Sequence, residues 1–135
     1  MKNLIKKALE TRKKAYAPYS KFFVGAALET DDGKIYTGCN IENSSLGITV
    51  CAERVALFNA ISSGARKLRR IAVVADMKTP CPPCGICRQA LFEFAPDLEV
   101  IMTNLKGEVR KSKLSALLPK AFRFNLAAPA HKKGR

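Results

Sequence analysis

The chain has 135 residues, the length of one ordinary domain, and its apolar fraction of 47% is sufficient to build a hydrophobic core. Its 24 basic and 11 acidic residues give a formal charge of +13, but the basic residues are dispersed and no aromatic residues alternate with them. This arrangement favours a solvated basic surface over a nucleic-acid-binding one, so nucleic acid is not an expected partner.

The first half of the chain predicts a helix, a strand hairpin and a second helix. Residues 2–14 have apolar positions at helical spacing between lysines, unlike the continuous apolar block of an export signal. Residues 22–30 and 34–42 are rich in strand-forming residues and flank Asp-Asp-Gly, which is a hairpin signal. After a loop, residues 51–63 again have helical spacing, and Gly64 ends that helix.

The second half predicts strands that alternate with helices. Residues 70–76 form a short apolar run bounded by charge, which is typical of a strand buried on both faces. The proline-rich residues 79–83 are incompatible with regular structure. The remaining predictions are a helix, a strand, a short fifth strand and a brief helix, at residues 84–95, 97–104, 108–112 and 113–119.

Alternating helices and strands predict an α/β fold, in which helices sandwich a central sheet. We expect a three-layer α-β-α sandwich with a mixed sheet of about five strands. A single domain is expected over residues 1–125, and residues 126–135 are expected to form a mobile basic tail.

Five cysteines in a chain without an export signal argue against a disulfide framework. Reduced thiols in the cytoplasm favour metal binding or catalysis, and the odd number of cysteines agrees with this. No run of about 18 apolar residues is present, so no membrane span is expected. The sequence therefore predicts a cytoplasmic protein.

Three cysteines, two of them at predicted helix starts, can meet at one point. Cys51 begins one helix and Cys84 another, and Cys87 follows Cys84 by about one helical turn. Helix N-termini stabilise thiolates, and three thiolates suit a tetrahedral zinc ion with its fourth position open to water. Glu53, two residues after Cys51, is placed to move a proton of that water without binding the metal.

Cys-x-Glu followed by Pro-Cys-x-x-Cys is the pattern of zinc-dependent nucleoside deaminases. The chain as a whole resembles the small, all-cysteine cytidine deaminases. The resemblance extends from about residue 15 to residue 122, and the matching segments are AYAPYSKFFVGAAL, GCNIEN, CAERVALFNA, PCGICRQ and LLPKAF. The combination is highly specific, whereas each segment alone is only suggestive.

The resemblance implies an activity and an assembly. The activity is hydrolytic deamination of cytidine and deoxycytidine in pyrimidine salvage, in which zinc-bound hydroxide attacks C4 of the base and ammonia is released. One zinc ion per subunit is implied, in a homotetramer with its sites at subunit interfaces. A carboxylate near the sugar accepts a hydrogen bond from a sugar hydroxyl and repels the negative charge of a phosphate. We therefore expect free nucleosides as substrates rather than nucleotides.

The resemblance also implies a role for individual residues. Cys51, Cys84 and Cys87 match the zinc ligands, and Glu53 matches the general acid and base. Arg54 matches an arginine that hydrogen-bonds the ligand sulfurs. The matches to substrate-binding residues are Asn40 and Glu42 for the ribose hydroxyls, Phe22 near the base, Ala52 for the 2-oxo group and Phe122 from a neighbouring subunit.

Several alternatives remain open at this stage. An iron–sulfur cluster would need a fourth cysteine where Leu91 stands, and a redox Cys-x-x-C leaves Glu53 unexplained. Cys81 is a spectator, a redox-labile neighbour or a fourth metal ligand, and we favour the spectator. Phe22 and Phe122 could instead be ordinary residues of the hydrophobic core, without a role in substrate binding.

Other functions compete with nucleoside deamination. Glu42 argues against a blasticidin-S deaminase, which lacks this carboxylate. Polynucleotide-editing deaminases have histidine where Cys51 stands. A zinc-stabilised nucleic-acid-binding module without catalysis is the remaining rival.

Overall fold

The structure is a computed structural model that describes residues 1–124. The tail predicted over 126–135 lies outside the described residues. The elements are α1 (Lys2–Arg12), β1 (Val24–Thr30), β2 (Ile35–Cys39), the 3-10 helix η1 (Leu46–Ile48), α2 (Ala52–Ser62), β3 (Leu68–Ala75), α3 (Gly85–Phe94), β4 (Glu99–Asn104), β5 (Val109–Lys113) and α4 (Leu114–Leu117). No helix among these is long and apolar enough to cross a bilayer.

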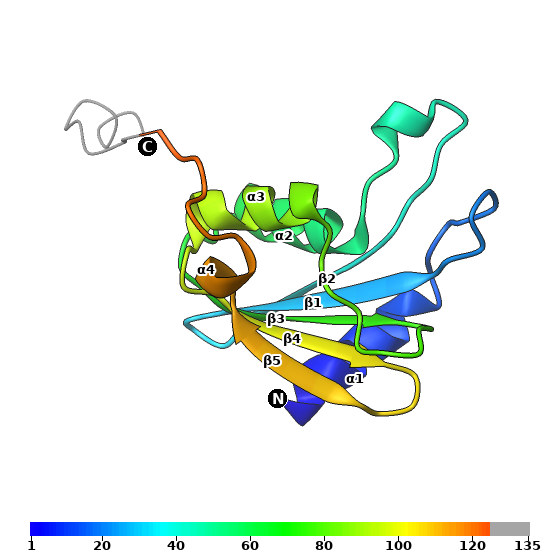
Figure 1. The fold of residues 1–135 in the computed structure, drawn as a ribbon, viewed down its shortest axis with the longest axis horizontal. Helices are drawn as coiled ribbons and strands as arrows, with labels where there is room; N and C mark the ends of the chain where they lie inside the picture. The colour runs from blue at the N-terminus through cyan, green and yellow to red at the C-terminus, as the bar shows by residue number, and fades with distance from the viewer. Residues whose placement is uncertain (125–135) are drawn as a thin grey trace.

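The five strands form one mixed sheet in the order β2-β1-β3-β4-β5. β3 and β4 are parallel, and each of the other neighbouring pairs is antiparallel. Figure 1 shows the sheet edge-on, with α1 on one side and α2 and α3 on the other. The predicted three-layer α-β-α sandwich with a mixed sheet is therefore confirmed.

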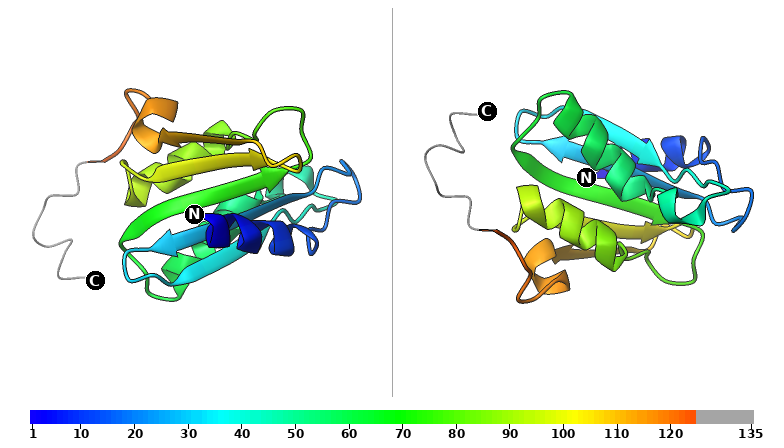
Figure 2. Two further views of the ribbon diagram at one scale, coloured as in Figure 1. Left: turned by 90° about the horizontal axis from the view of Figure 1, so that it is seen from below. Right: turned by 90° about the horizontal axis from the view of Figure 1, so that it is seen from above.

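Successive side chains of a strand point to opposite faces of the sheet, and here they form two separate apolar layers. Ala26 and Leu28 of β1 face α2 and α3, whereas Ala27 faces α1 and packs with Leu4 and Ala8. β3 contributes to both layers, and its last five residues are all buried, as its uninterrupted apolar run predicts. The sheet thus holds α2 and α3 side by side on one face (Figure 2).

Two glycines allow helices to approach the sheet backbone closely. A Cβ atom on Gly25 of β1 would lie 2.0 Å from the carbonyl oxygen of Ala8 in α1. A Cβ atom on Gly38 of β2 would lie 2.4 Å from the backbone nitrogen of Ala56 in α2. The contact at Gly38 brings the first two turns of α2 directly onto β2.

The predicted elements agree with the observed ones apart from small shifts. α1 ends at Arg12, two residues before the predicted end. β3 begins at Leu68, two residues earlier than predicted, because Leu68 still pairs with Thr30 across an irregular register. The loop predicted after β2 contains the single turn of η1.

Candidate active site

Both cysteines predicted to start helices are the N-cap residues of those helices. Cys51 precedes α2 and Cys84 precedes α3, each with an extended backbone conformation. Neither caps its helix with a side-chain hydrogen bond, so both thiols remain available for other partners. The partial positive charge of the two helix N-termini favours ionised sulfur there.

The thiols of Cys51, Cys84 and Cys87 lie within 4.8 Å of one another. The Sγ atoms of Cys51 and Cys84 are 3.7 Å apart. Tetrahedral Zn–S bonds of ~2.3 Å place their sulfurs ~3.8 Å apart, so this pair already has the spacing of a zinc site. The cluster, found within residues 1–124, has three donors, and their soft sulfur chemistry fits zinc.

Neighbouring groups polarise the cluster. Hydrogen bonding from the Cys87 thiol, and then from Arg54, lowers the pKa of Cys51 to about 5 despite its partial burial. The pKa of Cys87, the donor of that pair, is raised by the same hydrogen bond and by burial. Arg54 donates from Nη2 to the Cys51 sulfur at 3.6 Å. The Nε atom of Arg54 is buried and has no hydrogen-bond partner among the described residues. The guanidinium thus brings positive charge to the Cys51 sulfur.

Glu53 occupies the first turn of α2 and is only 4% exposed. Burial, with a further contribution from Cys51, raises the pKa of its carboxyl group to about 7. A buried carboxyl with such a pKa can both hold and release a proton near neutral pH. Glu53 is therefore chemically suited to general acid and base catalysis.

A pocket of about 260 Å³ lies beside the cluster. It brings together most of the predicted site residues, which come from four separate segments of the chain. These are Phe22, Asn40, Glu42, Cys51, Ala52, Glu53 and Cys84. Further lining residues were not predicted from the sequence, and they are Ser20, Val24, Thr49, Val50, Cys81 and Pro82.

Asn40 and Glu42 hold the backbone that leads into β1, in addition to lining the pocket. Asn40 accepts from the Val24 N–H at 2.9 Å and donates to the Phe22 carbonyl at 2.7 Å. Glu42 accepts from the N–H groups of Tyr19 and Ser20 at 3.0 and 3.1 Å, and from the Ser20 hydroxyl. Nothing in their residue types could reveal these long-range contacts.

Cys81 lies in the pocket wall, outside the three-thiol cluster. Its N–H donates to the Thr103 carbonyl at the end of β4 at 3.0 Å, and its thiol donates to the Pro82 carbonyl at 3.7 Å. Burial raises the pKa of this thiol to about 12. Cys81 is therefore a neutral thiol here, in a different environment from Cys51.

Residues after the last cysteine support the loop that carries Cys84. Arg88 donates to the Pro83 carbonyl at 2.8 Å and to the Leu117 carbonyl of α4 at 2.7 Å. Gln89 donates to the Phe122 carbonyl at 2.9 Å. Phe122 itself is 66% exposed and does not line the pocket of its own chain.

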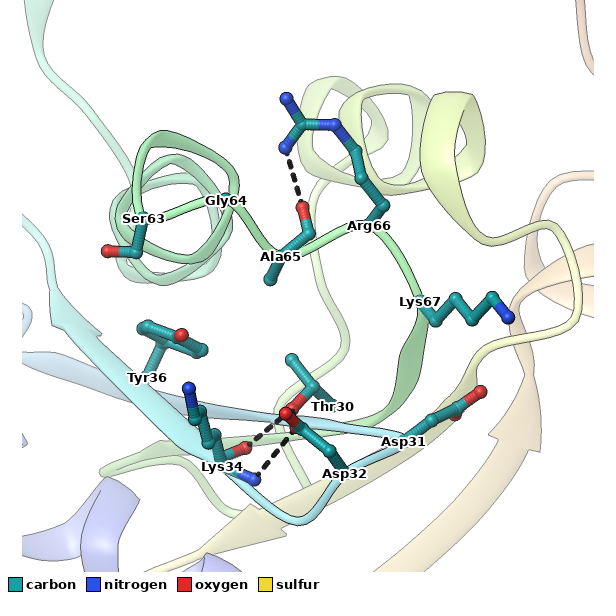
Figure 3. A pocket seen from close by; sticks show the side chains of 10 residues that line it. All are labelled: Thr30, Asp31, Asp32, Lys34, Tyr36, Ser63, Gly64, Ala65, Arg66 and Lys67. Atoms are coloured by element: carbon teal, nitrogen blue, oxygen red, sulfur yellow. Dashed lines mark hydrogen bonds between the residues drawn. The ribbon is translucent and has the colours of Figure 1, made fainter. Parts of the chain in front are cut away.

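A second hollow, of about 330 Å³, lies at the opposite ends of β1 and α2. Figure 3 shows that some of its polar groups interact locally, with Arg66 donating to the Ala65 carbonyl and Asp32 accepting from Thr30 and from the backbone of Lys34. It contains no thiol or histidine. Among the described residues, the three-thiol cluster and the buried Glu53 therefore lie away from this hollow.

Within residues 1–124, three thiols lie beside the pocket and no fourth ligand joins them. A zinc site with three protein ligands and one open position is the catalytic arrangement rather than the structural one. With the buried Glu53 in the wall of the same pocket, the site defines a zinc-dependent enzyme.

Comparison with known proteins narrows this class. Residues 1–103 match the model of the cytidine and deoxycytidylate deaminase zinc-binding region. A cytidine deaminase of Halalkalibacterium halodurans is 54% identical over 120 residues, which cover 88% of this chain and 91% of the relative. The 1.6 Å crystal structure of a cytidine deaminase from Burkholderia pseudomallei has a TM-score of 0.88 and 52% identity, and the match covers 90% of this chain and 98% of that one. The chain belongs to the cytidine deaminase family.

The predicted rival among related deaminases is more distant. A blasticidin-S deaminase from Bacillus cereus is 31% identical over 114 residues, covering 78% of this chain and 81% of the relative. The difference in identity favours the cytidine deaminase prediction over that alternative.

Proposed function

We propose that this chain hydrolyses cytidine and deoxycytidine to uridine and deoxyuridine, with release of ammonia, as an enzyme of pyrimidine salvage. Cys51, Cys84 and Cys87 hold one zinc ion per subunit. The observation that carries the proposal is the three-thiol cluster and the buried Glu53 in the wall of one pocket. Family membership at more than 50% identity supports the same reaction.

The net reaction joins a water oxygen to C4 of the base and breaks the bond from C4 to the amine nitrogen. Zinc, when bound, supplies a Lewis acid that lowers the pKa of water toward ~7. The Glu53 carboxylate takes one proton from the water and gives it to N3 of the base. It then takes the second proton and gives it to the departing amine, which leaves as ammonia while C4 becomes a carbonyl.

The remaining pocket residues orient the substrate in this proposal. The backbone N–H of Ala52 donates to the 2-oxo group, and the ring of Phe22 packs against the base. Asn40 and Glu42 bind the sugar hydroxyls. Because the Glu42 carboxylate repels a phosphate, cytidine monophosphate is a poor substrate.

We also propose that the chain works as a homotetramer in the cytoplasm, with Phe122 entering the pocket of a neighbouring subunit. Several exposed apolar side chains, including Phe58, Ile86, Phe122 and Phe124, support burial by a second copy. The five free thiols agree with a reducing compartment. Light scattering coupled to size-exclusion chromatography measures the subunit number, and a monomeric active enzyme would refute the assembly.

The proposed activity is tested by following the ultraviolet absorbance of the substrate. Cytidine, deoxycytidine, cytidine monophosphate, blasticidin S and a short single-stranded oligonucleotide are compared, with the zinc content measured in parallel. We expect turnover of the first two alone, with about one zinc per chain. Equal turnover of the monophosphate would refute the role of Glu42, and exclusive turnover of blasticidin S or the oligonucleotide would refute the function.

A further inference from the structure

We propose that Ser20 is a positioning residue that orients the Glu42 carboxylate toward the sugar of the substrate. The inference rests on the proposed function, because it concerns how the same pocket recognises a sugar hydroxyl. Ser20 lies in the loop between α1 and β1 and lines the pocket together with Glu42. No role follows for this serine from the metal chemistry.

The Ser20 hydroxyl has its donor and one acceptor position occupied. It accepts the N–H of Phe22 at 3.0 Å and donates to Oε2 of Glu42. Because a hydroxyl has one proton, the bond from Phe22 leaves that proton free to point at the carboxylate. The backbone N–H of Ser20 donates to Oε1 of the same group at 3.1 Å. One residue therefore contacts both carboxylate oxygens and fixes the plane of the carboxylate.

These contacts leave Glu42 with limited acceptor capacity. An ionised carboxylate has about four acceptor positions. Oε1 receives two N–H groups, from Tyr19 and Ser20, and Oε2 receives the Ser20 hydroxyl. About one position thus remains, on Oε2, in a group that faces the pocket. We infer that this position accepts a single sugar hydroxyl and that Ser20 determines its direction.

The local backbone is held in a costly conformation that maintains this arrangement. Lys21, which follows Ser20, has a φ of 60°, in the left-handed region that non-glycine residues rarely adopt. Its N–H donates to the Ala17 carbonyl at 3.0 Å, which closes a tight turn. A turn of this kind persists only when surrounding contacts support it, and it often occurs at ligand sites. Here the supporting contacts converge on Glu42.

The test compares Ser20→Ala with Ser20→Thr, which retains the hydroxyl. Removing a hydrogen bond to a charged group predicts a rise of about tenfold or more in KM for cytidine, with kcat within about threefold of the wild type. Ser20→Thr should return KM to near the wild-type value. Ser62→Ala is the matched control, because the exposed Ser62 hydroxyl makes only a local bond to the Asn59 carbonyl, and it should leave KM unchanged.

A substrate without the 2′- and 3′-hydroxyls of the sugar separates positioning from a general structural effect. With 2′,3′-dideoxycytidine, Ser20→Ala should have the KM of the wild type, since the ring hydroxyls that Glu42 is proposed to bind, at the 2′ and 3′ positions, are missing. In a Glu42→Gln background, Ser20→Ala should add much less than its own effect, because the two residues act through one interaction. Zinc content, measured for every variant, should stay near the wild-type value, and the melting temperatures of the Ser20 and Ser62 variants should stay near that of the wild type.

Two results would overturn the inference while leaving the function intact. One is an unchanged KM for cytidine in Ser20→Ala, and the other is an equal loss with cytidine and dideoxycytidine. If Ser20→Ala does not fold, an altered cytidine KM in the folded Ser20→Thr variant, with its hydroxyl still present, also overturns it. Absence of cytidine deamination by the zinc-loaded wild type refutes the proposed function itself.

Discussion

Replacing Gly38 by alanine tests how the sheet positions the metal site. Gly38 lies in β2 under the start of α2, and Cys51 is the N-cap of that helix. A Cβ atom at position 38 would lie 2.4 Å from the Ala56 nitrogen and 2.6 Å from the Ala52 carbonyl oxygen. Both contacts are with helix backbone, which cannot rotate away as a side chain can. The variant must therefore displace α2 as a unit.

The size of the effect follows from these distances. Ordinary van der Waals contact begins at about 3.4 Å, so α2 must move by roughly 1 Å. Overpacking of this kind costs about 1–3 kcal/mol, which corresponds to a fall of roughly 4–12 °C in Tm for a domain of this size. Zinc–ligand distances tolerate about 0.2 Å, so moving Cys51 by much more than this should also lower zinc content.

Thermal melting by circular dichroism and zinc analysis at fixed protein and zinc concentrations measure both effects. Gly47→Ala is the matched control, because a Cβ there meets nothing within 4 Å, and it should behave as the wild type. A Gly38→Ala protein with wild-type Tm and full zinc content would show that α2 does not depend on this contact.

Three further predictions concern the neighbourhood of the pocket. Arg54→Ala should retain zinc but lower kcat about tenfold or more, because the guanidinium no longer offsets the thiolate charge; unchanged kinetics at full zinc content would reject this. Cys81→Ala should keep full zinc content, because Cys81 lies outside the three-thiol cluster. In the native wild type, burial raises the pKa of Cys81 to about 12, so this thiol should resist iodoacetamide at pH 8 when the labelled sites are mapped by mass spectrometry. Loss of zinc from the variant or rapid labelling of Cys81 would contradict its placement. Hydrogen bonds from Ser20 hold the pKa of Glu42 below its usual 4.5, so its ionised form adds stability that is present above about pH 4.5 and lost as the pH falls through the lower folded value. The Tm advantage of the wild type over Glu42→Gln should therefore shrink below pH 4.5, and a difference independent of pH would contradict the assignment.

Much of the fold was predictable because its signals are local. The Asp-Asp-Gly turn, the uninterrupted apolar run of β3 and the helical spacing after Cys51 each specify an element from neighbouring residues alone. The start of β3 was less predictable, since Leu68 and Arg69 are included through pairing with a distant strand. Pairing between strands depends on contacts that no local window contains.

The candidate site divides in the same way. Helix-start positions and one-turn spacing predicted the three-thiol cluster, which the structure contains. The hydrogen bonds of Asn40 and Glu42 to the loop before β1, and the approach of α2 to Gly38, were not predictable, because they join segments far apart in the chain. The role of Ser20 was not predictable for the same reason, since a serine in a loop has no distinctive local pattern.

Glu53→Gln tests the central chemical claim most directly, since it keeps the size of the side chain and removes its ability to transfer protons. The account predicts a folded variant with about one zinc per chain and a rate of cytidine deamination about 100-fold to 10,000-fold below the wild type. A Glu53→Gln protein that deaminates cytidine at the wild-type rate, or an active wild type without bound metal, would contradict it.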